Sequence, residues 1–87
     1  MPTERHVLRL PDLGLSNVPM IASLWLVSRG SEVSAGDRVL EVLAGEVTVD
    51  LSAPASGHLI EKLVEDDEPI VVGQPLAIIE SPLARDL

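Results

Sequence analysis

The decisive stretch of this sequence is Leu40-Glu41-Val42-Leu43-Ala44-Gly45-Glu46-Val47-Thr48-Val49-Asp50-Leu51. It consists of two apolar runs with a small-residue break at Ala44-Gly45 between them. After the break, apolar residues alternate with polar ones, which is the period-2 pattern of a half-buried strand. We therefore predict a tight, exposed hairpin over residues 40–51, with Gly45 and Glu46 at its tip.

The sequence on either side of this hairpin repeats. When residues 20–43 are laid over residues 57–80, Gly36 falls on Gly73 and several apolar residues fall on apolar ones. The apolar pairs include Leu26 with Leu63, Val27 with Val64, Val33 with Ile70, Val39 with Leu76 and Val42 with Ile79. An internal repeat constrains the architecture before any other signal does. We predict two similar halves, about 6–43 and 47–80, related by a pseudo-twofold axis with the central hairpin close to it.

Composition limits the classes of protein and partner. With 87 residues, the chain is expected to form one small domain over residues 1–82, with residues 83–87 as a tail. Trp25 is the only aromatic residue, and six basic against fourteen acidic residues give a net charge of −8. This balance disfavours nucleic acid and anionic membranes as partners. No cysteine is present, and nothing at the start resembles a signal peptide, so we expect a cytoplasmic protein.

Strand signals dominate the chain. Seven prolines and six glycines punctuate short β-branched runs, and no window shows a sustained helical period. The run Leu24-Trp25-Leu26-Val27 is nearly continuous in apolar residues and predicts a strand buried on both sides. The fold class is all-β, and short strands at regular spacing indicate a flattened β-barrel or a sandwich.

Several motifs, taken in order, carry a family resemblance. They are Leu10-Pro11-Asp12-Leu13-Gly14, Trp25-Leu26-Val27, Gly36-Asp37, Ala53-Pro54-Ala55-Ser56-Gly57 and Val72-Gly73-Gln74-Pro75-Leu76. This set resembles the lipoyl domain of the E2 acyltransferase of 2-oxo acid dehydrogenase complexes, within the biotinyl/lipoyl-carrier family. The resemblance implies two similar four-stranded sheets with pseudo-twofold symmetry.

In that family, a lysine at the hairpin tip forms an amide with lipoic acid or biotin, and the cofactor carries the chemistry. Here Glu46 occupies that position, flanked by Gly45 and Val47, and a carboxylate cannot supply the amine. We therefore expect no bound lipoate at the tip, no metal, no catalytic residue and no enzyme activity. The expected function is that of a non-carrier protein-interaction or accessory module.

The resemblance also implies where partners would bind. In carrier members, the loop after the first strand and the hairpin tip contact partner enzymes, which corresponds to residues 13–18 and 44–47 here. The candidate contact residues are Leu15, Val18 and Glu46. The expected partners are acyltransferase or decarboxylase components of a complex, or a lipoyl ligase.

Two other functions stay open. One is a swinging-arm carrier modified at an atypical position, either Lys62, which is the single lysine of the chain, or the amino terminus. The other is a structural lipoyl-like adaptor module. Lys62 itself is expected to be a strand residue whose stem packs while its charge faces solvent.

The remaining candidate residues have structural explanations. The acidic run Glu65–Glu68 lacks a calcium-loop spacing and is expected to be a solvated turn. His6 and His58 are expected on strand surfaces, since no metal-ligand spacing links them. Trp25 is expected to be partly buried. No nucleophile motif of the Gly-x-Ser-x-Gly type frames the serines.

Overall fold

A computed structural model describes residues 2–15 and 17–83 of the chain, so all of the expected tail except Leu83 lies outside the described residues. The described part consists of strands joined by turns and loops, which confirms the all-β prediction. The strands are β1 (Thr3–Arg9), β2 (Met20–Trp25), β3 (Glu32–Val33), β4 (Arg38–Ala44), β5 (Val47–Ser52), β6 (Gly57–Lys62), β7 (Glu68–Ile70) and β8 (Pro75–Pro82). None of the described residues forms a helix of the length and hydrophobicity that a membrane crossing needs.

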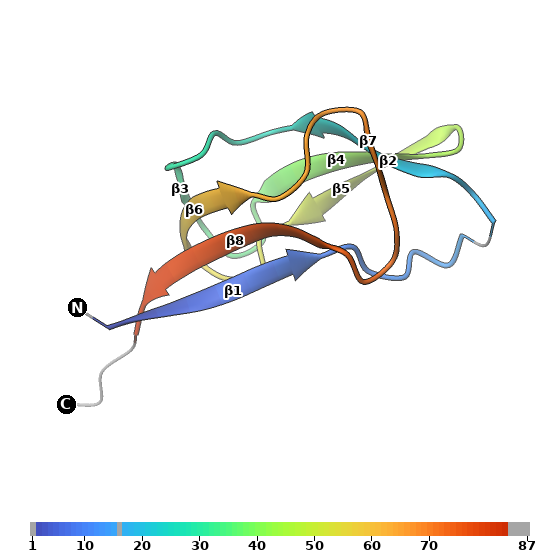
Figure 1. Ribbon diagram of the computed structural model, residues 1–87. Helices are drawn as coiled ribbons and strands as arrows, with labels where there is room; N and C mark the ends of the chain where they lie inside the picture. The colour runs from blue at the N-terminus through green and yellow to red at the C-terminus, as the bar shows by residue number, and fades with distance from the viewer. Residues whose placement is uncertain (1, 16, 84–87) are drawn as a thin grey trace.

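The strands form two antiparallel four-stranded sheets (Figure 1). Sheet A has the order β1-β8-β6-β3, and sheet B has the order β5-β4-β2-β7. Replacing each strand of sheet A by its counterpart in the other half of the chain gives the order of sheet B. Within the described residues, no strand pair joins the two sheets, so the architecture is a sandwich.

The repeat extends to individual hydrogen bonds. We call two residues mates when they occupy equivalent positions in residues 20–43 and 57–80. Gly30 donates its N–H to the carbonyl oxygen of Leu59 at 2.6 Å, and its mate Asp67 donates to Ala22, the mate of Leu59, also at 2.6 Å. The sequence repeat therefore reflects equivalent backbone geometry in the two halves.

The pseudo-twofold axis does not lie near the hairpin, and that part of the prediction is wrong. The symmetry exchanges the pair β4–β5 with the pair β8–β1. Since β1 and β8 carry the chain ends, the hairpin tip corresponds to the end of the molecule where the termini lie. Figure 1 shows the tip and the two termini at opposite ends of the sandwich. The hairpin is thus displayed at one end of the molecule.

The core lies between the sheets and is built almost entirely of aliphatic side chains. Its largest fully buried members are Leu10, Val39, Leu40, Val42, Leu59, Leu76 and Ile79. No polar side chain is buried among the described residues. Side chains along a strand point alternately to its two faces, so core positions mostly alternate with outward-facing ones. The exceptions are the consecutive buried pairs Val39–Leu40 on β4 and Leu76–Ala77 on β8.

The run Leu24–Val27 is not buried on both sides, contrary to the prediction. Leu24 is 49% exposed and Leu26 is 41% exposed, whereas Trp25 between them packs against the core. The strand β2 ends at Trp25, and its register against β4 shifts between Ala22 and Leu24. Leu24 therefore lies on the outer side of sheet B, and Leu26 is exposed just beyond the end of β2.

Candidate functional site

The hairpin tip is a two-residue turn, as the sequence predicted. Ala44 at the end of β4 pairs with Val47 at the start of β5, and Gly45 and Glu46 connect them. Gly45 has a φ of +63°, while Glu46 is not among the residues with positive φ. Type II′ hairpin turns prefer glycine at the first of their two central positions, and Gly45 occupies that position here. The turn places the exposed carboxylate of Glu46 at the outermost point of the hairpin.

The long loop between β1 and β2 packs against this tip. The N–H of Gly45 donates to the carbonyl oxygen of Pro19 at 3.2 Å. A Cβ atom on Gly45 would lie only 2.9 Å from Cγ1 of Val18. Leu15, from the same loop, is 38% exposed. The structure thus brings Val18 into contact with the tip and places Leu15 in the loop that supports it.

A third segment reaches the same end of the molecule and was missed by the sequence analysis. Ile70, the last residue of β7, pairs with Met20, and Met20 in turn pairs with Ala44 next to the tip. Val71 follows directly and is 66% exposed. Nothing in the local sequence distinguishes Val71 from a core valine, because its position depends on which strand β7 pairs with.

Lys62 lies away from the tip. Its ammonium nitrogen is 5.1 Å from the centre of the Trp25 ring. The ring is half-buried and donates its Nε1–H to the carbonyl oxygen of Val64 at 3.1 Å. Lys62 is itself half-buried. Its charge therefore rests on an aromatic face instead of projecting freely into solvent.

The histidines and the acidic run lie at separate places. His6 Nε2 is 2.9 Å from Oγ of Ser81, while His58 is exposed on β6, with β8 between the two strands. The segment Glu65–Glu68 forms the turn before and into β7. In the described part of the chain, no three His, Asp or Glu side chains are grouped so that they could hold a metal ion.

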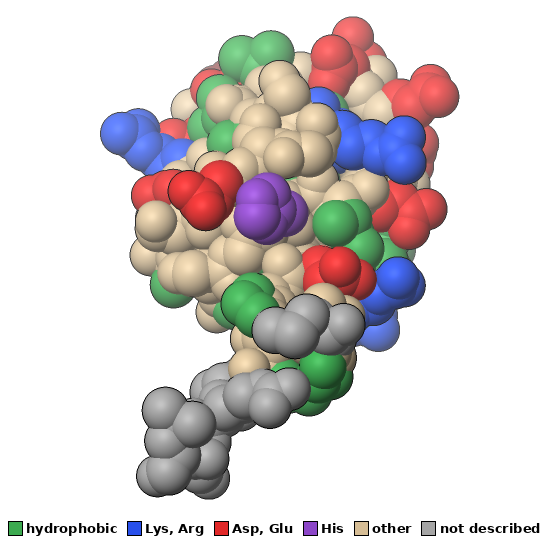
Figure 2. All heavy atoms as spheres, turned by 90° about the vertical axis from the view of Figure 1, so that its left-hand side faces the viewer, with side chains coloured by type: hydrophobic (Ala, Val, Ile, Leu, Met, Phe, Trp, Pro, Cys, Tyr) green, Lys and Arg blue, Asp and Glu red, His purple; other side chains and the backbone are tan. Residues whose placement is uncertain are grey.

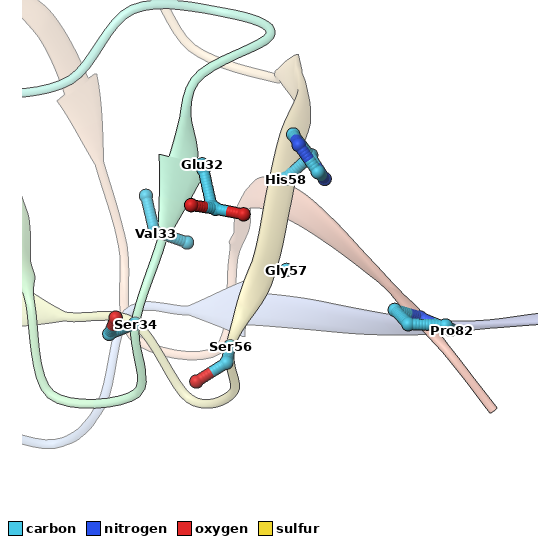
Figure 3. A pocket seen from close by; sticks show the side chains of 7 residues that line it. All are labelled: Glu32, Val33, Ser34, Ser56, Gly57, His58 and Pro82. Atoms are coloured by element: carbon cyan, nitrogen blue, oxygen red, sulfur yellow. The ribbon is translucent and has the colours of Figure 1, made fainter. Parts of the chain in front are cut away.

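A shallow hollow of about 350 Å³ lies at the edge formed by β3 and β6 (Figure 3). Its polar groups are partly used by the fold, because Ser56 Oγ accepts the N–H of Ala35 at 2.9 Å. Pro82, near the end of β8, also lines it. The hollow is therefore at the end of the molecule that carries the termini, and it is separate from the hairpin tip.

The fold and the hairpin define a class of protein: small all-β sandwich domains with one exposed hairpin turn at an end of the molecule. Comparison with known families is more specific. Residues 6–79 match the biotin/lipoyl family model, described as "Biotin-requiring enzyme". The chain belongs to this biotin/lipoyl family, which confirms the resemblance seen in the sequence.

Among curated proteins, the chain is similar to acetyltransferase components. It is 35% identical over 77 residues to the dihydrolipoyllysine-residue acetyltransferase component of the acetoin cleaving system of Pseudomonas putida, covering 88% of this chain and 21% of that protein. It is 32% identical over 79 residues to the corresponding component of the pyruvate dehydrogenase complex of Staphylococcus aureus, covering 91% of this chain and 18% of that protein. The chain thus spans about a fifth of the length of these relatives.

Among solved structures, the chain resembles part of a single-chain, multi-domain long-chain acyl-CoA carboxylase. The TM-score is 0.71, the sequence identity is 18%, and the match covers 93% of this chain and 7% of that one. At this identity the likeness establishes the fold alone.

Proposed function

We propose that this chain is a lipoyl-type domain that does not carry a cofactor at its hairpin tip and acts through contact with other proteins. The observation that carries the proposal is the exposed turn of Gly45 and Glu46, which offers a carboxylate. Lipoate and biotin attach to lipoyl-type domains through an amide with a lysine amine. The tip does not fit such a group, because Glu46 has no amine with which to form the amide.

The position of Lys62 supports the same proposal. A swinging arm needs an amine at the end of a mobile side chain that projects into solvent. Lys62 is half-buried, and its nitrogen lies 5.1 Å from the Trp25 ring centre. A cation held on an aromatic face is stabilised there by roughly 0.5–1 kcal/mol or more, which opposes its use as a free arm.

The partners that we propose are components of acyltransferase-type complexes, or an enzyme that attaches lipoate. The similarity to acetyltransferase components in Pseudomonas putida and Staphylococcus aureus supports this class. The contact surface would include Leu15, Val18 and Glu46, because the structure packs their loop and tip together at one exposed end.

Intact mass spectrometry tests the proposal. The protein, purified from its native host or incubated with lipoyl ligase, lipoate and ATP, is compared with a Glu46→Lys variant. We expect the parent to keep its unmodified mass and the variant to gain one lipoyl group, because only the amine is missing.

Two results would contradict the proposal. A modified parent would point to Lys62 or the amino terminus, and a Lys62→Arg variant would tell these two apart. An unmodified Glu46→Lys variant would mean that the tip is not equivalent to a carrier tip. Binding to acyltransferase components, with and without Leu15→Ser and Glu46→Gln substitutions, tests the contact surface separately.

A further inference from the structure

The outer face of sheet B carries a row of mainly apolar residues that are paired across its strands. Three apolar residues, Leu43, Ile21 and Pro69, are paired side by side across the strands, and the polar Thr48 continues the line on β5. We call these four residues the apolar row. Leu43 lies between the buried Val42 and Ala44 on β4, so its side chain is on the opposite face from the core. Leu43 and Ile21 are half-buried, and the two end residues are exposed.

The equivalent row on sheet A is charged and provides an internal control. It consists of Arg5, Glu80, His58 and Glu32, paired in the same order across the strands. His58 is the mate of Ile21, and Glu80 is the mate of Leu43. Arg5 Nε and Glu80 Oε2 lie 3.3 Å apart. The same backbone framework therefore accepts charged side chains at the positions equivalent to Leu43 and Ile21.

Charges border the apolar row on both sides. Glu46 lies beyond it at the tip, and Glu41 and Asp50 form the next outward-facing pair along β4 and β5. Asp50 is bridged to Arg38 at 3.3 Å, whereas the carboxylate of Glu41 has no hydrogen bond or ion pair to the described residues. With a net charge of −8 on the whole chain, this face attracts positive charge. The face that Figure 2 shows lies at the other end of the molecule and has acidic, basic and histidine side chains intermixed.

We propose that the apolar row is a docking surface for an amphipathic helix of a partner protein, with an aliphatic stripe flanked by lysine or arginine. A helix commonly buries its apolar stripe on a sheet face. The aliphatic stripe would cover Ile21 and Leu43, and the basic flanks would face Glu46 on one side and Glu41 on the other. This inference rests on the proposed protein-contact function and adds a second surface, next to the tip, with a defined partner chemistry.

The symmetry of the fold suggests variants that test the row with little damage to stability. Leu43→Glu and Ile21→His introduce the residue types that the mates carry on sheet A. Val7→Glu is the matched control, because Val7 is 42% exposed on the outer face of sheet A and the substitution adds the same charge. Urea unfolding of each variant verifies that it is folded.

The probe is a synthetic 18-residue amphipathic helix of leucine and lysine, titrated into ¹⁵N-labelled protein. We expect backbone amide shifts confined to the apolar row and the tip. Binding energy concentrates in a few residues near the centre of an interface, so Leu43→Glu should weaken binding about tenfold or more, which corresponds to about 1.4 kcal/mol or more. Ile21→His should weaken it in the same direction, and Val7→Glu should leave the affinity within about twofold.

Other outcomes would overturn the proposal. One is that the amide shifts are centred on sheet A. Another is that the parent protein binds a scrambled peptide of the same composition, or a peptide with glutamate in place of lysine, as tightly as it binds the amphipathic helix. A third is that Leu43→Glu binds the helix as tightly as the parent does. Self-association of the free protein that Leu43→Glu abolishes would identify a second copy as the occupant instead. If Leu15 and Glu46 substitutions reduce binding to acyltransferase components while Leu43→Glu and Ile21→His do not, this inference fails and the proposed function stands.

Discussion

The ammonium nitrogen of Lys62 lies 5.1 Å from the centre of the Trp25 ring. These two residues are mates, since each ends the equivalent strand of its half, Trp25 in β2 and Lys62 in β6. Mates can touch only where the pseudo-twofold axis passes between them. The axis therefore runs through this pair, within the sandwich and away from the hairpin tip.

The contact between Trp25 and Lys62 should contribute measurably to stability. We expect a double-mutant cycle with Trp25→Leu and Lys62→Met to give a coupling energy of about 0.5–1 kcal/mol, because the cation interacts with the ring quadrupole. The free energy of unfolding is measured by urea denaturation followed by circular dichroism. Arg9→Met, at the hairpin end of β1, should show no coupling to Trp25→Leu. Equal coupling for both basic residues would mean that the ring contact contributes nothing specific.

The fold was predictable because its signals are local or repeated. The alternation after Ala44 and the break at Gly45 specify the hairpin without reference to the rest of the chain. The match of residues 20–43 with 57–80 specifies two equivalent halves. The exposure of Leu24 was not predictable, because it follows from a shift in pairing register between Ala22 and Leu24 that no apolar run encodes.

The candidate site was predictable only in part. The tip residue Glu46 and the loop with Leu15 and Val18 follow from the hairpin and the family resemblance. The position of Val71 at the same end of the molecule could not be predicted, because it depends on the pairing of β7 with β2, which are far apart in the sequence. The apolar row on sheet B is also non-local, since it becomes visible only when Ile21 and Leu43 are paired and compared with their mates.

Replacing Asp67 by glycine, the residue of its mate Gly30, should stabilise the protein. Asp67 has a φ of +67°, and its mate is Gly30, with a φ of +90°. A left-handed backbone conformation costs a non-glycine residue roughly 1–2 kcal/mol, and glycine avoids this cost. Glycine also raises the conformational entropy of the unfolded chain, which cancels part of the gain in stability. We expect Asp67→Gly to raise the free energy of unfolding by about 0.5 kcal/mol.

The matched control for this change is Asp66→Gly, which removes the same charge from the same turn. Asp66 is not among the residues with positive φ. Asp66→Gly should therefore lower the free energy of unfolding of the protein, because glycine loses more backbone conformational entropy on folding. Urea denaturation followed by Trp25 fluorescence measures both variants. If both stabilise equally, relief of charge repulsion and not backbone conformation would be the cause.

The contact between Gly45 and Val18 should fix the conformation of the tip. Gly45→Ala introduces a Cβ that would lie 2.9 Å from Cγ1 of Val18, at a φ of +63°. We expect a loss of about 2 kcal/mol in the free energy of unfolding, from the left-handed backbone and the steric overlap together. Gly14→Ala has a similar φ of +73° with no atom within 4 Å, so it should lose only the backbone part.

A second substitution separates the two causes. In the Gly45→Ala background, Val18→Ala removes the methyl group that the new Cβ would meet, so it should recover part of the lost stability. In the parent protein, Val18→Ala should be mildly destabilising, because Val18 is half-buried against the tip. Amide shifts of residues 44–47 report whether the turn itself has moved. If Gly45→Ala is no more destabilising than Gly14→Ala and Val18→Ala restores nothing, the loop does not hold the tip, and residues 13–18 and 44–47 would act as separate contacts.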